Sequence, residues 1–309
     1  MMTISRLPRP LRGIIPPLVT PLLSPDALDH RGLEKLVERV IAGGVHGVFI
    51  LGTTGEGPSL SYALRREMIE RVTKQVGGRV PVLVAVTDTA YTETLRLTEF
   101  AAGAGADAVV LAAPYYFPSS QSDLLRLVEG LAETSALPLF LYNMPGLTKV
   151  QYEPETVAVA AEMPNVYGLK DSSGDLGYLA RAVAAVRHKP EFAVLLGPEE
   201  MLVEGMALGV HGGVNGGANL FPRLLVGLYE ACVAGREEEV RRLRQLVLEI
   251  NAVINAGGEP EFRYIRGLKC ALAVRGVCSD VPAWPYRAAD GAQRGVIQAE
   301  LKSFVEEWG

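Results

Sequence analysis

The sequence predicts an α/β protein, a (β/α)8 (TIM) barrel with a C-terminal helical extension. Short apolar runs recur along the chain, and each is followed by a turn signal and a helical pattern. The runs begin 20 to 34 residues apart, which is the length of one strand–helix unit. Their apolar residues are continuous, as expected for parallel strands buried on both faces. Eight units of this kind close most economically as a barrel.

The expected strands are the eight apolar runs Gly13–Leu18, Gly47–Leu51, Val80–Val86, Asp107–Ala112, Pro138–Tyr142, Val166–Lys170, Phe192–Leu196 and Gly212–Val214. Amphipathic helices are expected at Leu33–Ile41, Ala63–Val76 and Leu124–Leu131. Asp29 and Ser61 are expected N-caps, because their oxygens accept the free N–H groups of a first turn. The competing fold, an open doubly wound sheet, would need G-x-G-x-x-G after its first strand, and the sequence has none there.

The strand pattern stops after about Phe221. The remaining sequence predicts four helices, at Pro222–Ala234, Glu237–Ala256, Phe262–Arg275 and Ala292–Trp308. The first of them serves as the eighth helix of the barrel. We therefore expect a barrel domain over residues 1–235 and a helical extension over residues 236–309.

Composition excludes several functional classes. Hydrophobic residues make up 49% of the 309 residues, and the net charge of −5 gives no basic surface for nucleic acid. No apolar stretch approaches the ~18 residues of a membrane span, and no secretory signal is visible at the N-terminus. The three cysteines form no C-x-x-C pair, and metal-ligand spacings such as H-E-x-x-H are absent. We expect a cytoplasmic protein without metal, cofactor, nucleic-acid or membrane partner.

Lys170 is the candidate catalytic residue. Barrel enzymes place their chemistry at the C-terminal ends of the strands, and among seven lysines only Lys170 ends a strand. An apolar barrel mouth disfavours the ammonium form, and the neutral amine is the nucleophile for a Schiff base with a carbonyl substrate. The alternative is a structural lysine whose charge is paired with Asp171 or Asp175.

Tyr142 ends the preceding strand, so its side chain can enter the same barrel mouth. A phenol there can shuttle a proton between substrate and imine. The alternative is an ordinary buried tyrosine with a satisfied hydroxyl.

Two glycine-rich loops follow strands at the same end. Gly52–Gly57 offers the hydroxyls of Thr53 and Thr54 and the backbone of Gly55 to a carboxylate. The loop 212–219 can cradle a phosphate or form a flat floor under a bulky substrate. Glu199–Glu200 is expected at the start of the seventh helix, where carboxylates suit the helix dipole.

Four sequence blocks together resemble the dihydrodipicolinate synthase/N-acetylneuraminate lyase family. They are Gly52-Thr53-Thr54-Gly55-Glu56, Pro114-Tyr115-Tyr116, Tyr142-Asn143-x-Pro145 and Gly168-Leu169-Lys170-Asp171, in the order and at the spacing of the family. The resemblance runs from about residue 13 to the C-terminal helices. It implies a barrel with a C-terminal helical domain and a class I, metal-independent aldolase that forms a Schiff base with pyruvate.

The resemblance also implies roles for single residues. Lys170 corresponds to the imine-forming lysine and Tyr142 to the tyrosine that relays protons. Thr53 and Thr54 correspond to the residues that bind the carboxylate of the 2-keto acid, with Thr54 also in the relay. Tyr116 corresponds to a tyrosine inserted by a neighbouring subunit, so a homo-oligomer is implied, a dimer or a tetramer.

The last strand supplies the remaining positions of the site. By the same resemblance, Val214 corresponds to a position where a backbone carbonyl faces the substrate, and we assign Asn215 beside it to substrate specificity.

Departures from the family pattern bear on the substrate. Synthases usually carry an arginine two residues after Pro145, where it binds the carboxylate of aspartate semialdehyde, whereas this sequence has Leu147. Leucine offers neither charge nor donor, which removes a pair worth ~1.5–3 kcal/mol. We therefore expect aldol cleavage or formation of a 2-keto-3-deoxy sugar acid or a similar 2-keto acid. The alternatives are a 4-hydroxy-tetrahydrodipicolinate synthase, a sugar-acid dehydratase and a non-catalytic 2-keto-acid sensor.

Overall fold

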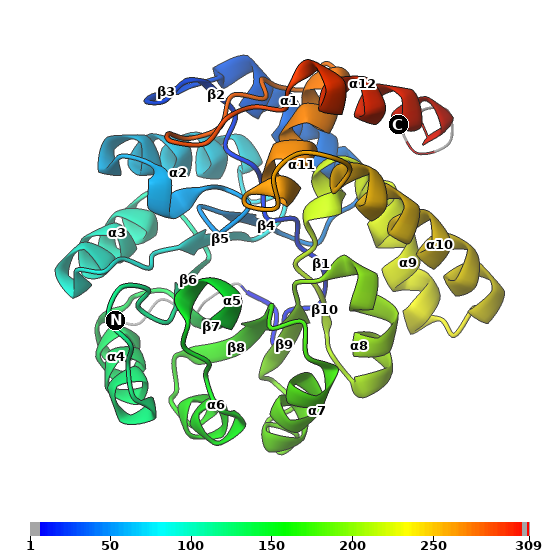
Figure 1. Ribbon diagram of the computed structural model, residues 1–309. Helices are drawn as coiled ribbons and strands as arrows, with labels where there is room; N and C mark the ends of the chain where they lie inside the picture. Colours follow the sequence, from blue (N-terminus) through cyan, green and yellow to red (C-terminus); the bar gives the residue numbers. More distant parts are fainter. Residues whose placement is uncertain (1–6, 305–307, 309) are drawn as a thin grey trace.

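The computed structural model of the protein describes residues 7–304 and residue 308. Residues 1–6, 305–307 and 309, at the two ends of the expected domains, lie outside the described residues. In the described part of the chain, eight parallel strands form one sheet at the centre, with helices around it (Figure 1). The expected (β/α)8 barrel is confirmed.

Each of the eight strands lies within its expected apolar run or extends at most one residue beyond it. They are β1 (Gly13–Ile14), β4 (Val48–Ile50), β5 (Val82–Ala85), β6 (Ala108–Ala112), β7 (Leu139–Asn143), β8 (Val166–Asp171), β9 (Ala193–Leu196) and β10 (Gly212–Gly213). Their order in the sheet is β1-β10-β9-β8-β7-β6-β5-β4, so neighbours in sequence are neighbours in space. This order brings all eight C-terminal ends to one rim.

The barrel closes between the N-terminal segment and β4. The expected first strand ran to Leu18, but regular pairing in β1 stops at Ile14, because Pro16 and Pro17 have no N–H to donate. Backbone hydrogen bonds between this segment and Phe49 of β4 complete the closure. The Phe49 N–H donates to the Pro16 carbonyl at 3.0 Å, and the Leu18 N–H donates to the Phe49 carbonyl at 2.8 Å.

Helices follow the strands and cover the outside of the barrel. They are α1 (His30–Ala42), α2 (Tyr62–Val76), α3 (Tyr91–Gly103), α4 (Gln121–Thr134), α5 (Pro145–Thr148), α6 (Pro154–Ala161), α7 (Leu176–Ala185), α8 (Leu202–Leu208) and α9 (Pro222–Val233). Both expected N-caps are confirmed: Asp29 accepts from the Gly32 N–H and Ser61 from the Leu64 N–H.

A short hairpin precedes α1 and was not expected from the sequence. Its strands β2 (Leu22–Ser24) and β3 (Ala27–Leu28) are antiparallel, and Leu22 also pairs with Val281 near the C-terminus. Two strands of two or three residues leave no alternation long enough to detect. The hairpin joins the start of the barrel to the C-terminal extension.

The C-terminal helices lie together on one side of the barrel (Figure 1). They are α10 (Glu237–Ile254), α11 (Arg263–Val274) and α12 (Gly291–Leu301), followed by the 3₁₀ turn η4 (Lys302–Phe304). Leu243 of α10 and Leu268 of α11 belong to the same hydrophobic core as the strands. The division after residue 235 therefore remains a prediction. Within the described residues, no helix combines the length and apolarity needed to cross a bilayer.

Candidate active site

Lys170 and Tyr142 lie side by side at the rim of the barrel. They are register partners on β8 and β7, so their side chains leave the sheet on the same face. The Lys170 Nζ lies 3.8 Å from the centroid of the Tyr142 ring and 4.9 Å from that of Phe49. Both Lys170 and Tyr142 are buried. The structure thus brings together the two residues that the strand ends indicated.

The two acids near Lys170 in sequence are engaged elsewhere. Asp171 accepts from the Asn143 amide at 2.8 Å and from the Ser173 hydroxyl at 3.0 Å. Burial raises the pKa of Asp171 in spite of these hydrogen bonds. Asp175 caps α7 by accepting from the Gly177 N–H at 2.8 Å. Neither acid therefore forms the structural ion pair with Lys170 that the alternative interpretation required.

The Tyr142 hydroxyl is linked to the turn after β4. The Thr53 Oγ1 lies 3.0 Å from the Tyr142 hydroxyl oxygen. Burial raises the pKa of the Tyr142 phenol, but the charge of Lys170 and the hydrogen bond with Thr53 outweigh burial, so that the pKa lies below its usual value. A phenol with a lowered pKa exchanges a proton more readily near neutral pH, as a general acid and base must.

The threonine that contacts Tyr142 differs from the one expected in the relay. The resemblance placed Thr54 there, but the hydroxyl within hydrogen-bond distance of Tyr142 is that of Thr53. Thr54 is buried beside it, 8% exposed. Adjacent residues in an irregular turn point in different directions, and their directions cannot be read from the sequence.

The glycines of this turn serve its own backbone. A Cβ at Gly57 would lie 1.9 Å from the Leu51 carbonyl oxygen, and one at Gly55 would lie 3.0 Å from the Leu51 nitrogen. The Thr20 hydroxyl donates to the Gly55 carbonyl at 2.7 Å. The sequence suggested that these glycines admit a ligand. The structure shows that Gly55 and Gly57 allow the turn to fold back on itself.

The loop after β10 carries Val214 and Asn215, and both are buried. The Asn215 amide donates to the carbonyls of Leu196 and Gly197, at 3.2 and 2.9 Å. Its Oδ1 is buried without a hydrogen-bond partner among the described residues. The amide nitrogen is thus committed to the backbone after β9, and a role of Asn215 in specificity stays a prediction.

Glu199 occupies the position that the phosphate interpretation of this loop would need. It lies in the 3₁₀ turn η2 (Glu199–Met201), ahead of α8, and accepts from the Gly217 N–H at 2.8 Å and the Tyr264 hydroxyl at 3.0 Å. A carboxylate on this N–H disfavours a phosphate there. Glu199 and Glu200 stand at the start of this helical segment, as expected, but the Glu199 carboxyl group is buried, and burial raises its pKa to about 7.

Tyr116 and Leu147 lie on the surface of this chain. Tyr116 is 76% exposed in the loop after β6, where its ring packs edge-on against Phe117 at 4.9 Å between centroids. Leu147 is 55% exposed in the short helix α5. The structure therefore does not bring Tyr116 into the Lys170–Tyr142 pair from within the described chain.

Sequence reasoning missed a buried ion pair beside the turn. Lys269 lies on a C-terminal helix, as expected, but its side chain is fully buried and pairs with the fully buried Glu56. The signal was present in the sequence. Lys269 stands in Gly267–Leu272, an otherwise apolar run without a polar face for a solvated lysine.

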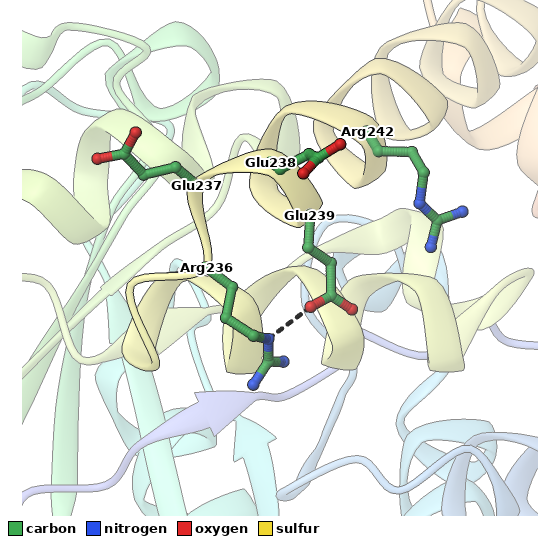
Figure 2. Close-up of a pocket in the computed structure, with 5 residues that line it drawn as sticks. All are labelled: Arg236, Glu237, Glu238, Glu239 and Arg242. Atoms are coloured by element: carbon green, nitrogen blue, oxygen red, sulfur yellow. Dashed lines mark hydrogen bonds and ion pairs between the residues drawn. The ribbon is translucent and has the colours of Figure 1, made fainter.

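A surface pocket at the N-terminus of α10 is unrelated to the strand ends. Figure 2 shows its five charged side chains, with Arg236 paired to Glu239. They project from the start of α10, a helix of the extension (Figure 2). Exposed pairs of this kind contribute little to stability, and none of these residues approaches Lys170 in the described contacts.

Comparison with known proteins gives a consistent result. The model of the dihydrodipicolinate synthetase family matches residues 10–303. A 4-hydroxy-tetrahydrodipicolinate synthase of Thermus thermophilus is 40% identical over 300 residues, which cover 96% of each chain. The solved structure of dihydrodipicolinate synthase from Bacteroides thetaiotaomicron is 50% identical, with a TM-score of 0.93, and the match covers 96% of this chain and 100% of that one.

A second solved structure resembles this chain and holds a ligand. It is a protein of the dihydrodipicolinic acid synthase family from Escherichia coli K12, in complex with pyruvate. It is 29% identical, with a TM-score of 0.89, and the match covers 94% of this chain and 98% of that one.

Proposed function

This chain belongs to the dihydrodipicolinate synthetase family, whose members are pyruvate-dependent Schiff-base lyases, and we propose that Lys170 is the residue that forms the imine. The observation that carries the proposal is the contact of the Lys170 Nζ with the Tyr142 ring, whose hydroxyl is linked to Thr53. Amine, phenol and hydroxyl then stand in one row, in which Lys170 and Tyr142 are buried and Thr53 is partly buried. Nucleophile and proton carrier are thus adjacent, as covalent catalysis on a carbonyl requires.

The reaction follows from this row of groups. The Lys170 amine adds to the 2-keto carbon of the substrate, and Tyr142 supplies the proton with which the hydroxyl leaves as water, so that a protonated imine and the Tyr142 phenolate form. Tyr142 accepts the proton of the C4 hydroxyl, and the C3–C4 bond breaks. Its electron pair moves to the imine nitrogen, an aldehyde departs and an enamine remains. Proton return to C3 and addition of water then release pyruvate and free the amine.

The substrate carboxylate binds at the turn after β4 in this proposal. The hydroxyls of Thr53 and Thr54 and the backbone N–H of Gly55 are the donors, and the Val214 carbonyl faces the substrate from the opposite loop. Thr53 also passes the proton of Tyr142, a role supported by the 3.0 Å separation of their hydroxyl oxygens.

A second copy of the chain completes the relay. Tyr116 is exposed together with Phe117, and such adjacent exposed aromatic rings are typical of interface centres. We propose a homo-oligomer, a dimer or a tetramer, in which Tyr116 of one copy reaches the site of its neighbour.

The aldehyde that leaves on cleavage, or adds to pyruvate in the reverse reaction, is uncharged. The compound that is cleaved is therefore a 2-keto-3-deoxy sugar acid or a similar 2-keto acid. Leu147 supports this, because an uncharged side chain on α5 gives an aldehyde carboxylate no partner. Synthesis of 4-hydroxy-tetrahydrodipicolinate from pyruvate and aspartate semialdehyde is the second candidate. It is favoured by the similarity to the 4-hydroxy-tetrahydrodipicolinate synthase of Thermus thermophilus and to the dihydrodipicolinate synthase of Bacteroides thetaiotaomicron.

Two assays separate these candidates. In the first, a panel of 2-keto-3-deoxy sugar acids is incubated with the enzyme, and released pyruvate is measured with lactate dehydrogenase and NADH. In the second, pyruvate and aspartate semialdehyde are supplied, and the product is coupled to its reductase. We expect turnover in the first assay and little in the second. Efficient turnover only in the second assay would establish the synthase.

A further inference from the structure

The backbone of the turn after β4 adopts an unfavourable conformation. Leu51 and Glu56 both have positive φ, at 61° and 56°, a region that non-glycine residues rarely occupy. The same turn brings Gly57 against the Leu51 carbonyl. A backbone of this kind persists only where the surrounding structure holds it in place. The contacts of Glu56 show what holds it.

The side chain of Glu56 is held by residues of the C-terminal extension. Its Oε1 accepts from the Ala283 N–H at 2.7 Å, and its other oxygen pairs with the Lys269 ammonium. Lys269 lies on α11 and also donates to the Val281 carbonyl at 2.8 Å. Burial lowers the pKa of Lys269, and the carboxylate of Glu56 opposes this shift. Two groups of the C-terminal extension, the Ala283 N–H and the Lys269 ammonium, thus fix one side chain of the turn.

We propose that Lys269 and Glu56 form a positioning pair, through which helix α11 holds the turn after β4 and keeps the Thr53 hydroxyl against Tyr142. The inference rests on the proposed function of Thr53 and Tyr142 in the relay. Glu56 lies three residues after Thr53, and its N–H donates to the Thr53 carbonyl at 3.0 Å. Movement of Glu56 is therefore transmitted directly to Thr53.

A buried ion pair suits this role better than an apolar contact. Apolar packing is tolerant of small shifts, whereas an ammonium and a carboxylate without water hold one geometry, because a displaced charge loses its partner. The C-terminal helices then do more than cover the barrel. They maintain the geometry of a relay to which they contribute no reacting group.

The test compares two buried cations of the same helix. Lys269→Met removes the contact with the turn. Arg266→Met is the matched control, because Arg266 is also buried but donates to the carbonyls of residues 259, 261 and 287 within the extension. The readout is the exchange of pyruvate methyl protons with solvent deuterium at saturating pyruvate.

We expect Lys269→Met to slow this exchange about tenfold, as the loss of one hydrogen bond in the relay would, and Arg266→Met to leave it nearly unchanged. Lys269→Arg, which keeps the charge, should restore most of the rate. Thr53→Val combined with Lys269→Met should be no slower than Thr53→Val alone, because both changes remove the same contact. Multiplied losses in the double variant would overturn the proposal, as would equal losses in Lys269→Met and Arg266→Met.

Two further measurements cover other outcomes. If Lys269→Met does not fold, Glu56→Gln replaces it, since glutamine keeps an acceptor for the Ala283 N–H but puts an NH2 group in place of the oxygen that pairs with Lys269. If the parent protein exchanges no methyl protons, the proposed function fails, and a crystal structure of the variant decides the positioning role alone. The distance between Thr53 Oγ1 and the Tyr142 hydroxyl, 3.0 Å in the parent, should exceed 3.5 Å. An unchanged distance would overturn the proposal.

Discussion

The Lys170 Nζ lies over the ring of Tyr142, its register partner on the neighbouring strand, at 3.8 Å from the ring centroid. One side of the ring contacts the nucleophile, and its hydroxyl contacts Thr53. Removal of the hydroxyl should therefore leave the amine in place and interrupt proton transfer. Each group of this row can be tested separately.

Tyr142→Phe should retain imine formation with pyruvate and lose turnover. The ring that packs on Lys170 remains, whereas the group that carries the proton is gone, so kcat should fall by ~10²–10⁴. Steady-state kinetics and methyl-proton exchange measure the loss, and borohydride trapping of pyruvate serves as the control for the imine. A variant with unchanged kcat would remove Tyr142 from the mechanism.

Thr53→Val should mainly lower kcat, whereas Thr54→Val should mainly raise KM. Thr53→Val removes the hydrogen bond to Tyr142, which raises the pKa of the phenol and lowers kcat about tenfold. Thr54→Val should mainly raise KM for the 2-keto acid, because it removes a carboxylate donor. The pH dependence of kcat and the KM of each variant check this. The reverse pattern would return the relay to Thr54.

Leu147→Arg should create activity with an aldehyde that carries a carboxylate. Leu147 is 55% exposed, so an arginine is accommodated with little cost to folding. A charge-assisted pair of ~1.5–3 kcal/mol corresponds to a gain of roughly 10- to 100-fold in kcat/KM for aspartate semialdehyde. Leu147→Gln is the uncharged control. Equal activity of both variants with aspartate semialdehyde would show that residue 147 does not contact the aldehyde.

Glu199 should make the protein less stable as pH rises from 5 to 7. The folded chain keeps this proton to about pH 7, whereas an unfolded chain releases it near ~4.3. Folding therefore takes up a proton between these values, and up to about 3 kcal/mol of stability is lost as pH rises through them. Denaturant unfolding at several pH values measures this slope, which Glu199→Gln should flatten. The same slope in both proteins would contradict the prediction.

Much of the barrel could be predicted because each strand is a continuous apolar run that ends at a turn. Residues such as Pro16 and Pro17 read as strand by composition but cannot donate to the ladder, so the first strand is shorter than expected. Lys170 and Tyr142 could be found because strand ends in a barrel share one rim. Side-chain directions inside loops have no period, so the contact of Thr53 with Tyr142 could not be inferred.

The burial of Glu56 and Glu199 could not be predicted from the sequence for another reason. Glu56 and Glu199 each stand in a polar or glycine-rich loop, where a carboxylate is ordinarily solvated. Their burial depends on Lys269 and Tyr264 of α11, more than sixty residues further along the chain. Only the docking of the extension brings these partners together.

The imine on Lys170 is the claim on which the mechanism depends, and trapping tests it directly. The protein is incubated with saturating pyruvate and borohydride, digested with trypsin and examined by mass spectrometry. We predict one reduced pyruvate on the peptide 150–181, with Lys170 uncleaved, and none in Lys170→Ala. An unmodified Lys170 at saturating pyruvate, or pyruvate attached to a different lysine, would contradict the account.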